Sequence, residues 1–181
     1  MSKTFLSLIT HVRVPLGYVL GFTYVLFSQP NPLSLYVGIP IALLGLFLRG
    51  WASGHLEKNL RLATTGPYGY SRNPLYLGTL LLGLGFSIAG ETLLLGVAFL
   101  LIMLLIYWPV MRQEEAALTH QFGSAYKTYA SEVPLFWPGL KASRTRTETF
   151  QWILYRKNRE YQAAAGFIGA VVFLYLKLWL R

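Results

Sequence analysis

Apolar residues are concentrated in five runs, and shorter polar segments separate them. The runs cover residues 14–27, 33–52, 75–89, 93–110 and 163–180. A helix needs about 20 apolar residues to cross a bilayer, and most of these runs approach that length. The first reaches it together with the apolar residues 6–10, whereas the third is short. This pattern predicts an all-α integral membrane protein with about five transmembrane helices.

Small residues at a spacing of four recur within these runs. They form the pairs Gly17/Gly21, Gly38/Ala42, Ala165/Gly169 and Gly166/Ala170. Such pairs allow two helices in a membrane to approach closely. The third and fourth runs are separated only by a predicted tight turn at residues 90–92, so we expect them to form a helical hairpin.

The longest polar section, residues 111–162, contains two further helical patterns. Leu118, Phe122, Tyr126 and Tyr129 recur at the period of an amphipathic helix, which Pro134 is expected to end. Residues 147–161 have the character of a second helix lying in the membrane interface. We expect a single domain over residues 1–181, with a catalytic core at about 54–138 and a C-terminal interfacial helix and last span at 147–181.

Composition supports the membrane assignment. The chain has 181 residues, of which 54% are hydrophobic and only 13% are charged, against about 25% charged in soluble domains. The net charge of +9 need not indicate nucleic-acid binding, because its distribution follows the positive-inside rule. The loops at 28–33 and 90–92 carry no Lys or Arg, and all basic residues except Lys177 and Arg181 fall on the other side.

That asymmetry predicts a cytoplasmic N-terminus, an external C-terminus and an active site on the cytoplasmic face. The membrane would be the plasma membrane in a prokaryote and the endoplasmic reticulum in a eukaryote. We expect membrane lipids and a lipophilic substrate from the bilayer as partners, and no nucleic acid. The sequence does not determine the oligomeric state.

The residues most often found in metal sites are sparse. The chain contains no cysteine, and His11, His55 and His120 are far apart and lack metal-binding spacing. No metal site is therefore predicted. His55 is either a histidine at a helix end or a catalytic base.

The polar stretch at residues 62–78 is the best candidate for chemistry. Asn73 suits an N-cap and Pro74 the first position of the helix that follows. A helix N-terminus carries a partial positive charge, which Arg72 would augment. We therefore expect this helix start to hold an anion such as a carboxylate.

A second polar cluster stands at the same predicted membrane level, where the fourth run ends. It contains Arg112, Glu114 and Glu115. One interpretation is a solvated helix end. In the other, Glu114 binds an ammonium group while the helix start at Asn73 binds a carboxylate, so that together they hold an amino-acid moiety.

Three linked motifs resemble the isoprenylcysteine carboxyl methyltransferases, a family within the wider group of membrane phospholipid methyltransferases. They are Leu-x-Thr-[Ser/Thr]-Gly-[Pro/Val]-Tyr at residues 62–68, Arg-[His/Asn]-Pro-x-Tyr-x-Gly at 72–78, and a Glu-Glu pair followed by Phe-Gly, two tyrosines and Val-Pro at 114–134. They span residues 60–138 in the family's order. The first and last apolar runs are matched by hydropathy alone.

This resemblance implies S-adenosyl-L-methionine as the methyl donor and a lipophilic acceptor. The acceptor group would be a carboxylate of an isoprenylcysteine-like substrate, a phospholipid amine or a thiol. The cofactor-binding residues that it implies are Leu60, Arg61, Leu62, Ala63, Tyr68, Asn73, Pro74, Leu75, Tyr76 and Glu114. Candidate catalytic residues are Arg112, Glu115 and His55, because an amine acceptor needs a base and an anionic head attracts a cation.

The chain departs from the family pattern at two positions. The family usually has His where this chain has Asn73, which can cap and donate but does not titrate near neutral pH. The family's substrate-binding Arg corresponds to Val110, and Arg112 lies two residues further on. A membrane reductase using NADPH and a non-enzymatic scaffold or transporter remain the alternative functions.

Overall fold

The computed structural model describes residues 3–58, 60–141 and 148–180, with side chains from residue 15 onward. Its described elements are helical: α1 (Lys3–Phe27), α2 (Pro32–Ser53), the short 3-10 helix η1 (Gly66–Gly69), α3 (Pro74–Ala89), α4 (Leu93–Ile102), η2 (Met103–Tyr107), α5 (Trp108–Phe122), α6 (Ser124–Glu132), α7 (Trp152–Lys157) and α8 (Tyr161–Trp179). The predicted all-α membrane fold is confirmed.

The elements α4, η2 and α5 form one helix of 30 residues, Leu93–Phe122. Its centre widens into the π-helical turn η2. Pro109 follows this turn, and because proline has no backbone N–H, it cannot donate the regular helical bond to the preceding turn. At 1.5 Å per residue the helix is about 45 Å long, so it extends beyond a hydrocarbon core of about 30 Å.

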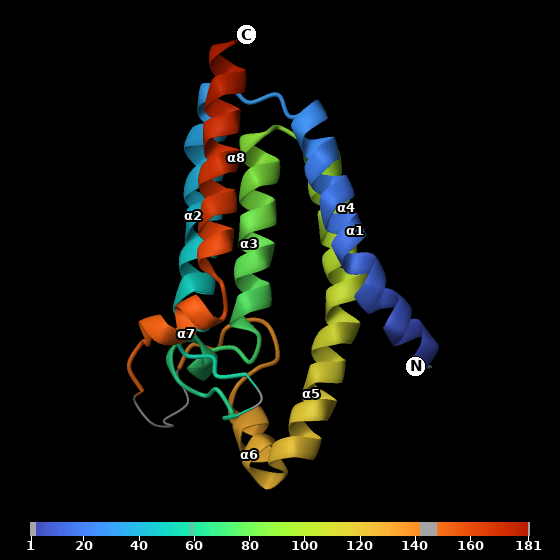
Figure 1. Cartoon of the computed structure of the whole chain (residues 1–181), viewed down its shortest axis with the longest axis vertical. Helices are drawn as coiled ribbons and strands as arrows, with labels where there is room; N and C mark the ends of the chain where they lie inside the picture. The colour runs from blue at the N-terminus through green and yellow to red at the C-terminus, as the bar shows by residue number, and fades with distance from the viewer. Residues whose placement is uncertain (1–2, 59, 142–147, 181) are drawn as a thin grey trace.

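Three helices are long and apolar enough to cross a membrane: Pro32–Ser53, Leu93–Phe122 and Tyr161–Trp179. The apolar helices Pro15–Phe27 and Pro74–Ala89 are shorter. The predicted five apolar helices are therefore present, and α3 has the short length expected from the third run. Figure 1 shows them side by side, with α6, α7 and the long polar loops gathered at one end.

Helices α2 and α3 pack with their backbones in close contact. A Cβ atom placed on Gly85 would lie 2.3 Å from the backbone nitrogen of Ala42, and one on Gly38 would lie 2.4 Å from that of Ala89. Ala42 and Ala89 are themselves fully buried. The close approach predicted from the Gly38/Ala42 pair is thus present, and it fixes α3 against α2.

The other small pairs do not serve packing within the described chain. A Cβ atom on Gly17, Gly21, Gly166 or Gly169 would meet no described atom within 4 Å. The helix packing predicted for these faces is therefore absent among the residues that the structure describes. Small residues permit a close approach, but the partner helix must also lie there.

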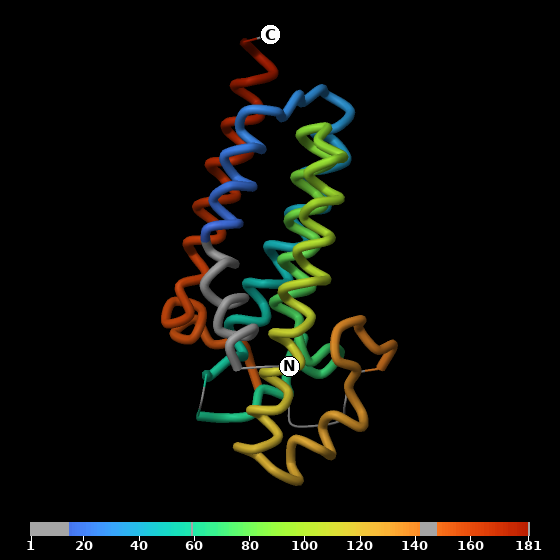
Figure 2. The backbone as a smooth tube through the Cα atoms, turned by 90° about the vertical axis from the view of Figure 1, so that its right-hand side faces the viewer, coloured from blue at the N-terminus to red at the C-terminus, as the bar shows by residue number. Residues whose placement is uncertain are grey.

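At the end opposite the polar loops, hydrogen bonds join α8 to the end of α1 and the α1–α2 loop to the α3–α4 turn. Lys177 of α8 donates through Nζ to the carbonyl oxygen of Val25 at 2.7 Å and so caps the end of α1. The backbone N–H of Gln29 donates to the Gly90 carbonyl oxygen at 2.7 Å. In Figures 1 and 2 the C-terminal end of α8, the α1–α2 loop and the α3–α4 turn share this end.

The amphipathic helix predicted across Leu118–Tyr129 is two helices. Gly123 has a φ of +54°, which separates α5 from α6, so the prediction of one continuous helix is wrong at this point. The apolar face is nevertheless used as expected, because Tyr126 and Tyr129 pack against Leu118 and Phe122. The helix ends at Glu132, just before Pro134.

The interfacial helix predicted over residues 147–161 is shorter than expected. Residue 147 lies outside the described residues, and α7 covers only Trp152–Lys157. Phe150 precedes the helix and packs edge-on against His55 at a ring separation of 6.4 Å. Leu154 is buried, whereas Ile153 is exposed.

Close packing at the α2–α3 contact predicts different effects for two glycine substitutions. Gly85→Ala should destabilise the protein by about 1–3 kcal/mol, because the added methyl group meets backbone rather than a movable side chain. Gly17→Ala adds the same group on a helix where nothing lies within 4 Å, and should leave stability unchanged or slightly raised. Thermal unfolding of the purified protein in detergent measures both, and equal effects would contradict the packing argument.

Candidate functional site

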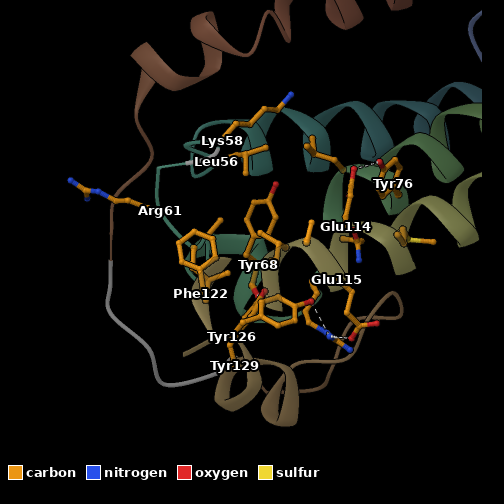
Figure 3. Close-up of a pocket in the computed structure, with 18 of the residues that line it drawn as sticks. Leu56, Lys58, Arg61, Tyr68, Tyr76, Glu114, Glu115, Phe122, Tyr126 and Tyr129 are labelled. Atoms are coloured by element: carbon orange, nitrogen blue, oxygen red, sulfur yellow. Dashed lines mark hydrogen bonds and ion pairs between the residues drawn. The ribbon is translucent and has the colours of Figure 1, made fainter. Parts of the chain in front are cut away.

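A cavity of about 520 Å³ opens at the polar end of the helices. Its walls come from the end of α2, the loop that follows, the start of α3, the long helix Leu93–Phe122, and α6 (Figure 3). Pockets that bind small molecules commonly have volumes of 300–1,000 Å³. The cavity brings together the polar stretch at residues 62–78 and the pair Glu114 and Glu115, which are far apart in the sequence.

Glu114 and the N-terminus of α3 face each other across this cavity. The Tyr76 hydroxyl donates to Glu114 Oε1 at 2.9 Å, as the dashed line in Figure 3 marks. Leu75 and Tyr76, in the first turn of α3, also line the cavity. A carboxylate and a helix N-terminus therefore meet in one space, with opposite electrostatic preferences.

Tyrosines form the wall nearest α6. The Tyr129 hydroxyl donates to the carbonyl oxygen of Tyr68 at 2.7 Å and so anchors η1 to α6. Burial raises the pKa of the Tyr68 hydroxyl far above its ordinary value, and the neighbouring Tyr129 and Glu114 raise it further. Tyr68 consequently stays protonated and able to donate a hydrogen bond. Its ring also offers a flat surface to a bound molecule.

Arg72 lines the cavity, but its charge is paired within the protein. It forms an ion pair with Glu115, which also pairs with Arg112 at 2.8 Å. Arg72 also donates to the Tyr126 hydroxyl at 3.1 Å. The expected contribution of Arg72 to anion binding is therefore largely neutralised by Glu115. The same two arginines hold Glu115 in its ionised form, which makes it a poor base.

Asn73 occupies the predicted N-cap position of α3, but its side chain does not cap the helix. The amide nitrogen Nδ2 donates instead to the carbonyl oxygen of Leu135 at 2.9 Å. The neighbouring backbone N–H of Arg72 donates to the Pro134 carbonyl oxygen at 3.0 Å. Asn73 thus ties the start of α3 to the segment after α6, a role that the sequence did not indicate.

The structure gathers most of the predicted site residues in this cavity. Those that line it are Arg61, Leu62, Ala63, Tyr68, Asn73, Leu75, Tyr76, Glu114 and Glu115. Four others do not line it: Pro74 and His55 are buried, and Leu60 and Arg112 are exposed. The roles of these residues remain predictions.

His55 is buried among other side chains and does not line the cavity. Its Nδ1 lies 3.0 Å from Thr65 Oγ1, and a Cβ atom on Gly66 would lie 2.6 Å from its ring. Burial lowers the pKa of the His55 imidazole, although Glu148 opposes this effect. These contacts place His55 against the turn before η1, and its role as a catalytic base remains a prediction.

Sequence reasoning missed several polar residues of the cavity wall, and Arg49 is the one with the strongest contacts. It lies near the end of α2 and pairs with Glu160, which immediately precedes α8, at 2.6 Å. It also donates to Thr79 Oγ1 of α3 at 2.5 Å. The available signal was an arginine within an apolar run, which is costly in a membrane and commonly functional.

Residues that could bind a metal ion are not clustered in the part of the chain that the structure describes. No group of three or more His, Cys, Asp or Glu side chains is arranged there to hold a metal ion. The polar side chains that line the cavity are carboxylates, hydroxyls, amides, arginines and Lys58.

Comparison with known proteins identifies relatives in bacteria. The chain is 34% identical over 116 residues to the cobalt-zinc-cadmium resistance protein CzcN of Cupriavidus metallidurans, covering 63% of this chain and 53% of that protein. It is 30% identical over 113 residues to the nickel-cobalt-cadmium resistance protein NccN of Alcaligenes xylosoxydans xylosoxydans, covering 61% and 51%. The chain thus spans about half the length of these relatives. No solved structure matches it.

The family comparison covers most of the part of the chain that builds the cavity, but not Tyr126 and Tyr129 of α6. The sequence model of the phospholipid methyltransferase family matches residues 34–125, which is just over half of the chain. This range runs from the start of α2 through the end of α5 and contains the Tyr76–Glu114 contact. The narrower resemblance to isoprenylcysteine carboxyl methyltransferases is not resolved by this match. The chain belongs to the phospholipid methyltransferase family.

Proposed function

We propose that this protein is an S-adenosylmethionine-dependent methyltransferase that acts on a lipophilic acceptor at the membrane. The observation that carries the proposal is the pairing of Glu114 with the N-terminus of α3 across one cavity. The amino-acid moiety of the donor has an ammonium group and a carboxylate. Glu114 suits the first and the N–H groups at the start of α3 suit the second.

The remainder of the cavity fits the nucleoside part of such a donor. Tyr68, Phe122 and Tyr126 line it together with the loop residues Leu62 and Ala63. Aromatic rings stack on a nucleobase, and loop backbone groups provide hydrogen bonds to its edge. The volume of about 520 Å³ is also in the range of sites for cofactors of this size.

A carboxylate is the acceptor that the site favours. When bound, S-adenosylmethionine supplies a methyl group whose bond to sulfur breaks as a bond to the acceptor oxygen forms, so the sulfonium and carboxylate charges are both lost. A carboxylate is already ionised and needs no base. An amine needs one, and the two candidates are poorly suited, because Glu115 is paired with two arginines and His55 does not line the cavity.

The chain's own contribution is then positioning and exclusion of water. Leu75, Tyr107 and Met111 give the cavity an apolar wall beside the Tyr76–Glu114 contact. The charged reactants are less strongly solvated in such a site than in water. Because both charges are lost in the reaction, this lowers the free energy of the transition state relative to that of the bound reactants. Phospholipid amines, favoured by the family description, and thiols are the alternative acceptors.

Removing the Glu114 charge should weaken donor binding. We expect Glu114→Gln to lower the affinity for S-adenosylhomocysteine by about tenfold or more, because the ammonium group loses its counter-charge. Calorimetric titration measures this directly. Glu132→Gln on α6, outside the cavity, is the matched control and should keep the affinity of the unaltered protein. Unchanged binding in Glu114→Gln would refute the cofactor assignment, and NADPH binding would favour a reductase.

The chemistry of the product distinguishes the acceptor classes. Membranes containing the active protein, incubated with methyl-labelled S-adenosylmethionine, should yield a lipid-soluble labelled product. If the acceptor is a carboxylate, mild alkali will release the label as volatile methanol, because methyl esters hydrolyse under these conditions. Label that survives alkali treatment would instead identify an N-methylated amine or an S-methylated thiol. Glu114→Gln serves as the inactive comparison.

The names of the two relatives suggest a physiological setting for this chemistry. Both are named as metal resistance proteins. We infer that esterifying a carboxylate at the membrane surface removes a negative charge, which lowers the local concentration of divalent cations near the bilayer. Cells expressing the active chain should therefore tolerate more cadmium than cells expressing Glu114→Gln at the same level. If both kinds of cell tolerate the same cadmium concentration, methyl transfer by this chain has no part in metal resistance.

A further inference from the structure

Two tyrosines from different helices form one part of the cavity wall, next to Glu114. Tyr76 lies in the first turn of α3 and Tyr107 ends η2, and both line the cavity. Their ring centroids are 5.5 Å apart and the ring planes are inclined by 63°, so the rings meet edge to face. Both side chains are half-buried. Tyr107 lies within the fourth apolar run, outside all three sequence motifs, and has no role in the site so far beyond its apolar surface.

Tyr76 connects this pair of rings to the carboxylate proposed to bind the ammonium of the donor. Its hydroxyl donates to Glu114 Oε1 at 2.9 Å, whereas its ring packs against Tyr107 (Figure 3 shows the first of these contacts). One tyrosine side chain therefore spans the distance from Glu114 to the ring of Tyr107. In S-adenosylmethionine a similarly short carbon chain joins the ammonium to the sulfonium. A donor whose ammonium is bound by Glu114 can therefore reach these rings with its sulfonium.

The arginines that line the neighbouring wall are already paired. Arg49, which contacts Thr79 one turn beyond Tyr76, donates from Nε and Nη2 to the two carboxylate oxygens of Glu160. Arg72 forms an ion pair with Glu115. Pairing reduces the repulsion that either arginine would exert on a cation in the cavity. The surroundings of the two rings, with the carboxylate of Glu114 beside them, therefore favour a positively charged group.

An aromatic ring is a suitable partner for a sulfonium in particular. The face of a tyrosine ring attracts cations through its quadrupole, and the attraction is larger where water is excluded. A sulfonium carries three carbon substituents and no N–H or O–H group, so it cannot donate the hydrogen bonds that hold an ammonium. Its charge is consequently better recognised by ring faces than by a polar side chain.

The backbone of η2 gives Tyr107 a defined position. The N–H of Trp108 donates to the carbonyl oxygen of Met103, five residues back, whereas a regular α-helix uses the residue four back. Single π-helical turns of this kind within α-helices occur frequently at functional sites. Met103 packs with Leu77 and Leu80 of α3, which fixes the start of the turn against that helix. Tyr107 is therefore presented to the cavity by an anchored turn.

Resting on the proposed function, we propose that Tyr107 and Tyr76 bind the sulfonium of S-adenosylmethionine through their rings and so distinguish the methyl donor from its product. The donor carries a positive charge on sulfur, whereas S-adenosylhomocysteine has a neutral thioether at the same position. The rings thus add to the affinity for the donor and add little to that for the product. Tyr107 is a specificity-determining residue of the donor site.

This selectivity favours release of the product. The rings lose their attraction once the methyl group has been transferred, because the electron pair of the broken carbon–sulfur bond stays on sulfur and cancels its charge. The product is then bound more weakly than the donor, which displaces it. Since the attraction exists before the transfer and declines as the charge is lost, the rings act on KM and product release rather than accelerating the transfer itself.

Equilibrium binding of the two ligands tests this role without any methyl transfer. The purified full-length protein is titrated calorimetrically with S-adenosylmethionine and with S-adenosylhomocysteine in lipid-free detergent, where no lipid acceptor is present. We expect the unaltered protein to bind S-adenosylmethionine at least about threefold more tightly than S-adenosylhomocysteine, because only the former carries the charge on sulfur. Equal affinities would overturn the proposal.

Variants of Tyr107 separate the attraction from packing. Tyr107→Leu removes the ring but keeps an apolar side chain, so it should lower the affinity for S-adenosylmethionine by at least about threefold and that for S-adenosylhomocysteine by much less. Tyr107→Met, which fills more of the ring's space, should behave in the same way if Tyr107→Leu does not fold. Tyr107→Phe keeps the ring and should keep the preference. Phe99→Leu is the matched control, because it removes a ring from the same apolar cluster without lining the cavity, and both affinities should stay unchanged.

The pattern of the two affinities decides between the possible results. An equal loss for both ligands in Tyr107→Leu, or no loss for either, would overturn the role of Tyr107 while leaving the cofactor assignment of the cavity intact. Loss of the preference in Tyr107→Phe would assign the effect to the hydroxyl and also overturn the proposal. If the unaltered protein binds neither ligand, the proposed function itself is wrong, and the role of Tyr107 with it.

Discussion

The close approach of α2 and α3 is the constraint on which the site depends. Backbone atoms of the two helices meet at Gly38, Gly85 and the fully buried Ala42, so their relative position has little freedom. Further along the same contact, Gly45 and Gly78 bring the helices together where Arg49 crosses. The packing that holds α3 therefore also sets how far its N-terminus stands from Glu114 and where Arg49 reaches Thr79.

Pairing of charges then decides which polar groups remain available. Arg72 and Arg112 both form ion pairs with Glu115, and Arg49 forms one with Glu160. Glu114, bonded through one oxygen to the Tyr76 hydroxyl, has no arginine partner among the described residues. A carboxylate in that position can accept a cation from a ligand, whereas Glu115 cannot without losing an arginine. Glu114 and Glu115 are adjacent on one helix, but their different partners give them different roles.

Prediction from sequence succeeded where a pattern is local. The helix start at Pro74, the turn after Ala89 and the apolar face of Leu118 through Tyr129 follow from spacing and residue type. The sequence did not reveal contacts between distant segments, such as Asn73 with Leu135 or Arg49 with Glu160. It also could not distinguish small residues that meet a partner helix, such as Gly85, from those that do not, such as Gly17. Both depend on which helices become neighbours.

Asn73 illustrates how a long-range contact changes the meaning of a motif. In the family that the motif resembles this position usually holds a histidine, which titrates near neutral pH, whereas Asn73 does not. Here the amide Nδ2 donates to the Leu135 carbonyl oxygen and holds the segment after α6 against the start of α3. Neutral histidine can also donate such a bond from one ring nitrogen. Asparagine makes this bond without titrating, so the contact between the start of α3 and the segment after α6 does not depend on pH.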